Sequence, residues 1–397
     1  MERVLDGIRV LDFSRFVAAP YCGLLLADMG AEVIRVESPG GNFDRKLGPF
    51  APNNESLPFS MIVPRNKKGI TLKLRSEKGK EIFKELVKNT DIILHNFTSG
   101  SMEAKILNYE SLKEINPGII LVSVTGFGAT GINSHLPCFD STAQALSGGM
   151  IFNGFPDTQP TRSAVAYVDI CTGVYAAYGA SLAIQHRLKT GEGQVVDISL
   201  LDVASTFIST MGVAAEYQVL DHVRPQIGNS SYYNYTDSFE ARDGWLMISV
   251  ITNSIWYRFL AVIGREDLKG DSRFRDDMAR FDNRDVLNPY VSKWMKERTV
   301  DEVISVLGKA RVPCGKVNSI PEMVHDQKNS DRDMIIDLEY PGVGKVPVPG
   351  VVTKMSKTPG RIDRLAARVG EHNDEIYCDL LGLTTEELEG YKSEGIV

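Results

Sequence analysis

One acidic side chain stands at the start of a segment that could support covalent chemistry. Asp169 precedes a stretch in which small side chains recur at helical spacing, at Gly173, Ala176, Ala177 and Ala180. Such a strip allows another helix or a ligand to approach closely. A carboxylate at a helix N-terminus can act as a nucleophile, and nearby amides can stabilise an oxyanion. An aspartate before a helix more often serves as its N-cap. Spacing alone leaves both interpretations of Asp169 open.

A glycine-rich segment, Gly126–Gly131, matches the G-x-G-x-x-G dinucleotide pattern and follows an apolar run. That pattern binds a pyrophosphate only where a helix opens directly after it, and Ile132–Pro137 is a poor helix start. Glu37 stands where a ribose-binding acid would, but the preceding turn, Ser14–Pro20, has no glycine. We therefore expect no dinucleotide site. We interpret Gly126–Gly131 as a loop that another group can approach closely.

Cysteine and histidine residues are dispersed along the chain. The five cysteines form no C-x-x-C pair, and the six histidines form no H-E-x-x-H motif. No G-x-S-x-G elbow occurs either. The N-terminal residues lack the order of a signal peptide, and the longest apolar stretch, Gly173–Ile184, is shorter than a membrane span. The sequence therefore predicts a cytoplasmic protein with reduced thiols, no metal and no membrane association.

Short apolar strands alternate with helices in the first half of the chain. The expected strands are Arg9–Phe13, Val33–Glu37, Asp91–His95, Ile119–Thr125 and Val195–Ser199. The expected helices are Pro20–Met29, one capped by Ser76, Tyr109–Ile115 and Cys171–Leu188. Strands this apolar, separated by helices, are typical of a parallel sheet that is covered on both faces. We expect a doubly wound α/β domain.

The pattern restarts in the second half of the chain. A helix over about Leu200–Leu220 leads into a linker at Arg224–Ser231. A strand at Trp245–Val250 and further helices at Ser254–Ile263 and Val300–Lys309 follow, and the chain bends near Pro313–Asn318. Near the C-terminus, Thr384 and Glu387 have the spacing of a capping box. These elements suggest a second, smaller domain.

Composition limits the possible partners. The chain has 397 residues, of which 43% are hydrophobic and 24% charged, as in globular proteins with a sizeable core. It carries 44 Lys and Arg against 51 Asp and Glu, a net charge of −7. Nucleic-acid binding needs basic clusters that displace counterions. We therefore expect no nucleic-acid partner, while local basic pockets leave small anionic ligands possible.

Several motifs, in this order and spacing, resemble the class III CoA-transferases, the group that includes formyl-CoA, carnitine and bile-acid CoA-transferases. The matching segments are Leu5–Phe13, Leu26–Pro39, Arg65–Leu72, Asn96–Phe97, Asp169–Gly173, Lys189–Gln194 and Gly370–Glu375. The similarity extends from about residue 5 to the C-terminus. It implies a large Rossmann-like domain made from both chain ends, a smaller inserted α+β domain, and an interlocked homodimer. The expected bounds are 1–203 and 326–397 for the large domain, 204–226 for a linker helix and 227–325 for the small domain.

The resemblance also implies a reaction. Asp169 matches the family's nucleophile, whose carboxylate attacks an acyl-CoA thioester and forms an acyl-aspartyl anhydride. The CoA thiolate then forms an aspartyl-CoA thioester, which an acceptor carboxylate attacks. CoA thereby moves between acids without ATP, provided that water is kept out. Acyl-CoA thioesters are expected as substrates, and no permanently bound cofactor is implied.

The resemblance assigns a coenzyme A groove to specific positions, with some departures. The matching positions are Val17, Ala18, Ser38, Leu72, Lys73, Leu74, Arg75, Asn96, Phe97, Thr98, Pro137 and Asp140. Val17, Ser38 and Pro137 replace a glutamine, an arginine and a lysine of the formyl-type enzyme, and Ala104 replaces an arginine. Lys73, Arg75 or Lys105 could supply the charge for the CoA phosphates instead. The missing four-glycine loop favours an acyl group larger than oxalate, with succinyl-CoA or acetyl-CoA as possible donors.

Three alternatives to CoA transfer are compatible with the same scaffold. An α-methylacyl-CoA racemase needs two bases, and similar racemases carry a histidine where this chain has Phe139. An acyl-CoA hydrolase would let water intercept the anhydride. A non-catalytic CoA-binding protein would tolerate Asp169→Asn, whereas an enzyme would lose turnover and still bind CoA.

Overall fold

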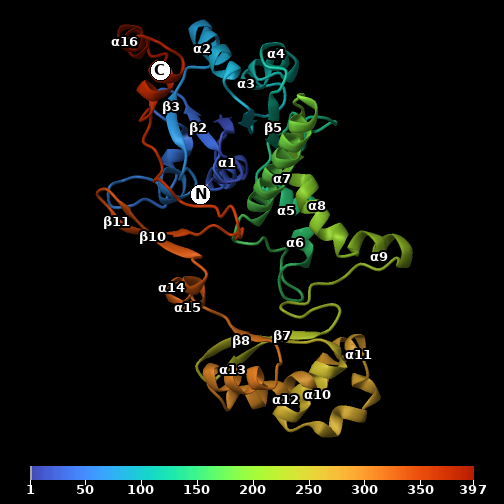
Figure 1. Cartoon of the computed structure of the whole chain (residues 1–397). Coiled ribbons are helices and arrows are strands. Elements are labelled where there is room, and N and C mark those ends of the chain that lie inside the picture. Colours follow the sequence, from blue (N-terminus) through green and yellow to red (C-terminus); the bar gives the residue numbers. More distant parts are fainter. Residues whose placement is uncertain (1) are drawn as a thin grey trace. The chain divides into compact units, whose positions relative to one another are not determined.

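The computed structural model describes residues 2–397, which form two compact units. The larger unit contains the residues up to Gly149, Ser163–Ala215 and Gln327–Val397, so that both chain ends belong to it (Figure 1). The smaller unit contains Met150–Arg162 and Glu216–Asp326. Across residues 2–397, no helix combines the length and apolar character needed to span a bilayer.

A six-stranded sheet forms the centre of the larger unit, with the strand order β3-β2-β1-β4-β5-β6. Every neighbouring pair is parallel. The strands are β1 (Arg9–Asp12), β2 (Glu32–Glu37), β3 (Lys68–Thr71), β4 (Ile92–His95), β5 (Ile120–Thr125) and β6 (Val195–Ser199). The predicted mixed α/β class with a parallel sheet is confirmed. The order reverses between β1 and β4, and such a switch point is where open α/β sheets bind ligands.

Both faces of the sheet are covered because consecutive strand residues point to opposite sides. Val10 packs in one apolar cluster with the helices α1 (Ala18–Asp28) and α7 (Tyr167–Thr190). Leu11 packs in another with α2 (Glu77–Lys88), α4 (Tyr109–Ile115) and α16 (Thr385–Ser393). The expected Ser76 cap of α2 and the capping box of α16 are both present.

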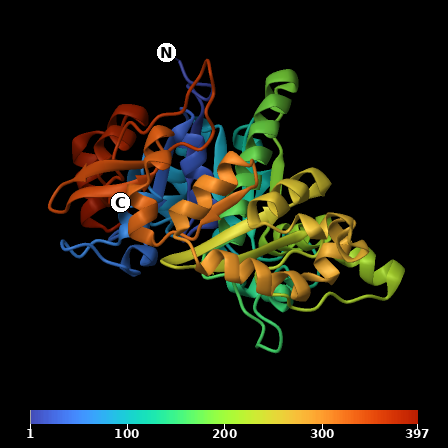
Figure 2. The same cartoon turned by 90° about the horizontal axis from the view of Figure 1, so that it is seen from below.

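The C-terminal segment lies beside the first strands of the sheet, although more than 300 residues separate them (Figures 1 and 2). The Tyr377 hydroxyl donates to the carbonyl oxygen of Thr71 at 2.6 Å, and the Lys73 N–H donates to the carbonyl oxygen of Ile396 at 2.7 Å. These contacts hold the edge strand β3, which the sequence analysis did not predict.

Shorter elements complete the larger unit. The helical ones are η1 (Phe43–Lys46), η2 (Leu57–Ile62), α3 (Met102–Ile106), α5 (Asp140–Leu146), α8 (Leu200–Thr210), α15 (Gln327–Asp331) and η5 (Glu375–Leu380). The strands β10 (Ile335–Tyr340) and β11 (Gly344–Pro349) form an antiparallel pair. The single helix expected over residues 200–220 is wrong: α8 ends at Thr210, and α9 (Val213–Leu220) begins after Gly212, whose φ is +75°.

The smaller unit combines an antiparallel sheet with helices. Its strands are β7 (Tyr235–Ala241), β8 (Gly244–Val250) and β9 (Cys314–Lys316). The helical elements are α10 (Thr252–Ile263), η3 (Glu266–Gly270), η4 (Ser272–Phe274), α11 (Asp277–Asp282), α12 (Arg284–Lys296), α13 (Val300–Lys309) and α14 (Ile320–His325), and α6 (Gly149–Phe152) begins at the boundary between the units. Buried aromatic side chains, including Trp256 and Phe259, fill the core of this unit.

Candidate active site

Asp169 lies inside the first turn of α7, not in front of it. The helix begins at Tyr167, and Ala166 precedes it with no side-chain cap. The N-cap interpretation of Asp169 is therefore wrong. The carboxylate of Asp140 takes that role from outside the helix, because its Oδ2 accepts from the N–H groups of Val168 at 2.9 Å and Asp169 at 3.1 Å. The side chain of Asp169 is thus left for chemistry.

Asp140 is fixed by a second side chain. The amide nitrogen of Gln144 donates to Oδ1 of Asp140, and Oε1 of Gln144 accepts from the N–H of Ser163 at 2.9 Å. Asp140 and Gln144 are both buried. Asp140 was expected among the CoA-binding positions, but it lies behind the start of α7 and lines neither hollow described below. Both carboxylate oxygens of Asp140 already accept hydrogen bonds from the protein.

The surroundings of Asp169 disfavour its charged form. Burial raises the pKa of its carboxyl group from 3.8 to about 7, and the nearby charge of Asp140 contributes in the same direction. Near neutral pH, both the acid and the carboxylate are populated. A poorly solvated carboxylate is a stronger nucleophile than a hydrated one, so this environment suits attack on an activated carbonyl.

Asp169 lines a hollow of about 340 Å³ in the larger unit. The hollow lies at the carboxyl ends of β1, β4 and β5, where the strand order reverses. Among the expected site residues, it is also lined by Val17, Ala18, Arg75, Asn96, Phe97, Thr98 and Pro137. Ala18 is the first residue of α1, whose first N–H groups lack partners within the helix and can face an anion.

A second hollow, of about 360 Å³, continues the first. The two share Arg15, Arg75, Phe97 and Glu103. The remaining expected residues that line the second hollow are Ser38, Leu72, Lys73 and Leu74. Folding therefore brings together every expected site residue except Lys105 and Asp140. Lys105 is exposed on α3 outside both hollows.

Lys73, Arg75 or Lys105 was expected to supply positive charge for the CoA phosphates, but the wall shared by the two hollows also contains Arg15. Arg75 forms an ion pair with Glu103 at 2.6 Å, which reduces its availability for a phosphate. Arg15 was missed. Its guanidinium lies 5.5 Å from the centre of the Phe97 ring, and within residues 2–397 no ion pair joins it to a carboxylate. The available signal was an arginine three residues after the end of the buried strand β1.

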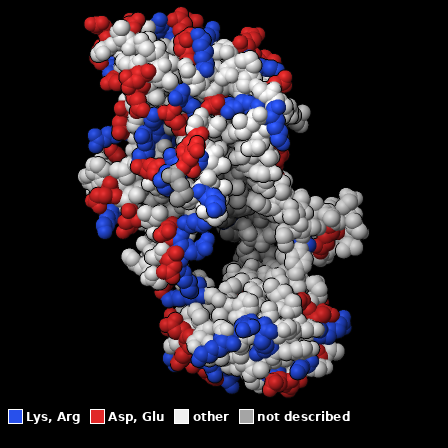
Figure 3. All heavy atoms as spheres, in the orientation of Figure 1, with Lys and Arg blue, Asp and Glu red and all other residues white. Residues whose placement is uncertain are grey.

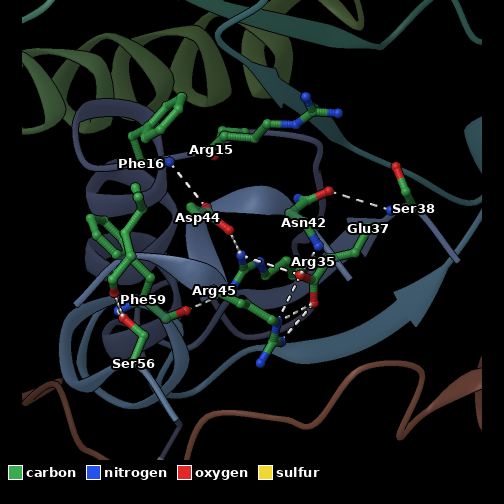
Figure 4. Close-up of polar contacts among 12 residues, drawn as sticks. Arg15, Phe16, Arg35, Glu37, Ser38, Asn42, Asp44, Arg45, Ser56 and Phe59 are labelled. Atoms are coloured by element: carbon green, nitrogen blue, oxygen red, sulfur yellow. Dashed lines mark hydrogen bonds and ion pairs between the residues drawn. The ribbon is translucent and has the colours of Figure 1, made fainter. Parts of the chain in front are cut away.

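Buried ion pairs support the loop that carries Arg15. Nζ of Lys67 lies 2.8 Å from Oδ2 of Asp12, with both side chains almost fully buried. Arg35 pairs with Asp44 at 2.9 Å, and Asp44 accepts from the N–H of Phe16 at 3.1 Å (Figure 4).

Glu37, a possible ribose-binding acid, is instead buried in an internal network (Figure 4). Its carboxylate pairs with Arg45 at 2.6 Å and with Arg35 at 3.3 Å. It also accepts from the N–H of Asn42 at 3.1 Å. Because its oxygens are occupied within the protein, Glu37 is not available for a dinucleotide ribose.

The glycine-rich loop does not cradle a phosphate. A Cβ on Gly126 would lie 2.2 Å from Cβ of Cys138, so this glycine allows the Cys138 segment to approach. The N–H of Gly128 donates to the Thr125 hydroxyl at 2.9 Å, and the N–H of Ala129 donates to Asp197 at 2.9 Å. The predicted close approach is confirmed, and the approaching group belongs to the chain itself.

The small-residue strip of α7 packs against α1. A Cβ on Gly173 would lie 2.6 Å from the carbonyl oxygen of Ala18, while Ala176 and Ala180 are fully buried. This close crossing sets the start of α1 beside the turn of α7 that carries Asp169. The strip therefore serves helix packing.

A family model described as CoA-transferase family III matches residues 5–373. A succinyl-CoA–D-citramalate CoA-transferase of Chloroflexus aurantiacus is 35% identical, covering 100% of this chain and 98% of the relative. A succinyl-CoA:mesaconate CoA-transferase of Haloarcula hispanica is 34% identical over 97% of this chain and 98% of the relative. The solved structure of a CAIB/BAIF family protein from Brucella suis has a TM-score of 0.84 and 30% identity, covering 96% of this chain and 100% of that one.

Proposed function

The chain belongs to CoA-transferase family III, and from this premise we propose that Asp169 carries CoA from an acyl-CoA donor to a free carboxylic acid. The observation that supports this role is the half-buried Asp169 carboxyl, whose pKa is raised to about 7, in a hollow lined by the expected CoA-binding residues. Groups with perturbed pKa values in a concave site are good candidates for catalysis.

The proposed reaction begins with attack of an Asp169 carboxylate oxygen on the thioester carbonyl. The C–S bond breaks, CoA leaves as its thiolate, and an acyl-aspartyl anhydride remains. The thiolate next attacks the aspartyl carbonyl of the anhydride, which releases the donor acid and leaves Asp169 as a CoA thioester. The acceptor carboxylate attacks the carbonyl of that thioester, which breaks the C–S bond, releases the CoA thiolate and forms a second anhydride. The thiolate then attacks the acceptor's carbonyl, which gives the acceptor-CoA thioester and frees the Asp169 carboxylate. We assign stabilisation of the developing oxyanions to the N-terminus of α1, because Val17 and Ala18 line the same hollow as Asp169.

The two adjoining hollows would divide the coenzyme between them. The thioester belongs beside Asp169, and the nucleotide belongs in the hollow lined by Ser38 and the segment Leu72–Arg75. Arg15 lies in the wall that both hollows share, so we assign it a phosphate contact. Arg75 contributes less because Glu103 already neutralises it.

We propose succinyl-CoA as donor and a dicarboxylic acid of four or five carbons as acceptor. The support comes from the names of the relatives, which include succinyl-CoA with citramalate and mesaconate, and a succinate–glutarate CoA-transferase of Agrobacterium fabrum that is 33% identical over 95% of both chains. The same names favour neither hydrolysis nor racemisation. Phe139, which has no proton to exchange, stands where a racemase histidine would be needed.

We propose a homodimer in which the smaller unit is an inserted domain. Its support is an apolar face on α7, where the exposed side chains of Val174, Tyr178 and Leu182 recur at four-residue spacing. In the view of Figure 3, Lys, Arg, Asp and Glu side chains are sparse over one area of the larger unit. Exposed apolar patches of this kind mark interaction sites. We further propose that the enzyme is cytoplasmic, since all five cysteines are free thiols. We also propose that it has no permanent cofactor, because the proposed steps use only Asp169 and the CoA thioesters.

Mass spectrometry after mixing with acyl-CoA thioesters tests the function. Succinyl-CoA should give an adduct on the peptide that contains Asp169, and hydroxylamine should convert it to a hydroxamate. Asp169→Asn should abolish the adduct and retain CoA binding. Asp202→Asn, which changes an exposed aspartate in the first turn of α8, is the matched control and should keep the adduct. Bound CoA without an adduct from any donor would contradict the proposed mechanism.

A further inference from the structure

Two aromatic rings form part of the wall around Asp169, and the reaction steps above do not use them. Phe16 and Phe139 both line the hollow that contains Asp169. Their ring centres lie 5.5 Å apart, and the rings meet edge to face at 89°. Phe139 is 58% exposed in the chain by itself. A partly exposed aromatic pair at the edge of a reaction site offers an apolar surface to whatever binds there.

The backbone of Phe16 is held in an unfavourable conformation. Its φ is +65°, in the left-handed region that bulky side chains rarely adopt. The N–H of Phe16 donates to Asp44, which is buried and paired with Arg35 (Figure 4). Strained residues persist where the surrounding structure enforces them, and they cluster at functional sites. The buried pair thus fixes the position from which the Phe16 ring meets Phe139.

Phe139 is fixed from the other side of the hollow. It is the residue before Asp140, at the N-terminus of α5, and Asp140 binds the first turn of α7 through two backbone N–H groups. The ring of Phe139 and the carboxyl of Asp169 are therefore positioned by the same short segment. The two rings come from separate loops and converge on one hollow.

We propose that Phe16 and Phe139 form an aromatic cover that keeps water from the acyl-aspartyl anhydride, so that the pair sets the ratio of CoA transfer to acyl-CoA hydrolysis. This inference rests on the proposed function of Asp169. Excluding water from an active site protects reactive intermediates from hydrolysis. The rings supply apolar surface at the point where the thioester and the anhydride would lie.

The competing reaction is a simple hydrolysis. Water attacks the acyl carbonyl of the anhydride, and the bond between that carbon and the Asp169 oxygen breaks. The products are the carboxylate of the donor acid and the regenerated Asp169 carboxylate, with two protons released, one of which the CoA thiolate can take up. In transfer, the same anhydride is consumed by the thiolate. The two outcomes compete for one intermediate, so their ratio reports access of water.

The test supplies succinyl-CoA and glutarate and measures two rates. Release of free CoA reports hydrolysis, after subtraction of the rate without enzyme, and formation of glutaryl-CoA reports transfer. Phe139→Ala and Phe16→Gly should each raise the hydrolysis-to-transfer ratio about tenfold. Phe139→Leu retains apolar bulk and should raise it less. Phe155→Ala removes an equally exposed phenylalanine from the smaller unit and should leave the ratio unchanged.

Two results would contradict the proposal that Phe16 and Phe139 exclude water. One is a ratio within twofold of the wild-type value in both Phe139→Ala and Phe16→Gly. The other is a higher KM with slower transfer and no added hydrolysis, which would make the rings a binding surface only. Absence of an Asp169 adduct in the wild-type protein would instead contradict the proposed function, and the hydroxylamine experiment detects that failure separately.

Discussion

Replacing Asp169 by asparagine should stabilise the fold at alkaline pH while it abolishes catalysis. Burial and the charge of Asp140 raise the pKa of Asp169 in the folded protein from 3.8 to about 7. Between these two values the folded chain holds a proton that the unfolded chain has lost. Stability therefore falls as the pH rises through this window. Asparagine carries no charge at any pH, so the variant avoids the cost.

The magnitude follows from the size of the shift. Each pKa unit corresponds to about 1.4 kcal/mol, so the rise from 3.8 to about 7 sets an upper value of about 4 kcal/mol. Residual solvent at the hollow screens part of this cost, and we expect about 2–4 kcal/mol at pH 8. At pH 5 the wild-type protein has lost only part of this stability, because pH 5 lies in the lower part of the range between 3.8 and about 7. The gain at pH 8 should be at least about twice that at pH 5.

Urea unfolding of the wild-type protein and Asp169→Asn at pH 5 and pH 8 measures this difference. The midpoint of the variant should exceed that of the wild type, with the larger increase at pH 8. Asp202→Asn alters an exposed aspartate on α8 and should change the midpoint equally at both pH values. An equal gain for Asp169→Asn at both pH values, or a loss at pH 8, would refute the assignment of a buried, poorly solvated carboxyl.

Three further predictions concern the rate, the coenzyme and the packing. Since the nucleophile is the carboxylate of Asp169, kcat/KM should rise with pH up to about 7, and a flat profile between pH 6 and 8 would contradict this role. Arg15→Gln should raise KM for acyl-CoA about tenfold or more with little change in kcat. Arg75→Gln should have a smaller effect because Glu103 pairs with it, and equal effects in steady-state assays would disprove the distinction. Gly173→Ala should cost about 1–3 kcal/mol in urea unfolding because the new Cβ meets a carbonyl oxygen of α1 at 2.6 Å. Gly308→Ala, with open space around it on α13, should cost nothing.

Local patterns in the sequence determined most of the central fold. Five apolar runs separated by helices indicated a covered parallel sheet, because a strand buried on both faces needs continuous apolar residues. Ser76 and Thr384 marked helix starts correctly, since a cap depends on residues within one turn. The order of several short motifs pointed to the family, and Asp169 was the only acid at the start of the small-residue helix.

The tertiary structure decided what depends on residues far apart in the chain. Strand β3 exists because it pairs with β2 and is held by the C-terminal segment, and its own residues, Lys68–Thr71, carry no strand pattern. Asp140 became the cap of α7, and Glu103 neutralised Arg75, through contacts that no spacing rule predicts. Burial, pKa and water access around Asp169 arise from loops that meet only on folding. The sequence therefore supplied the reactive group, and the folded chain supplied the environment that makes it reactive.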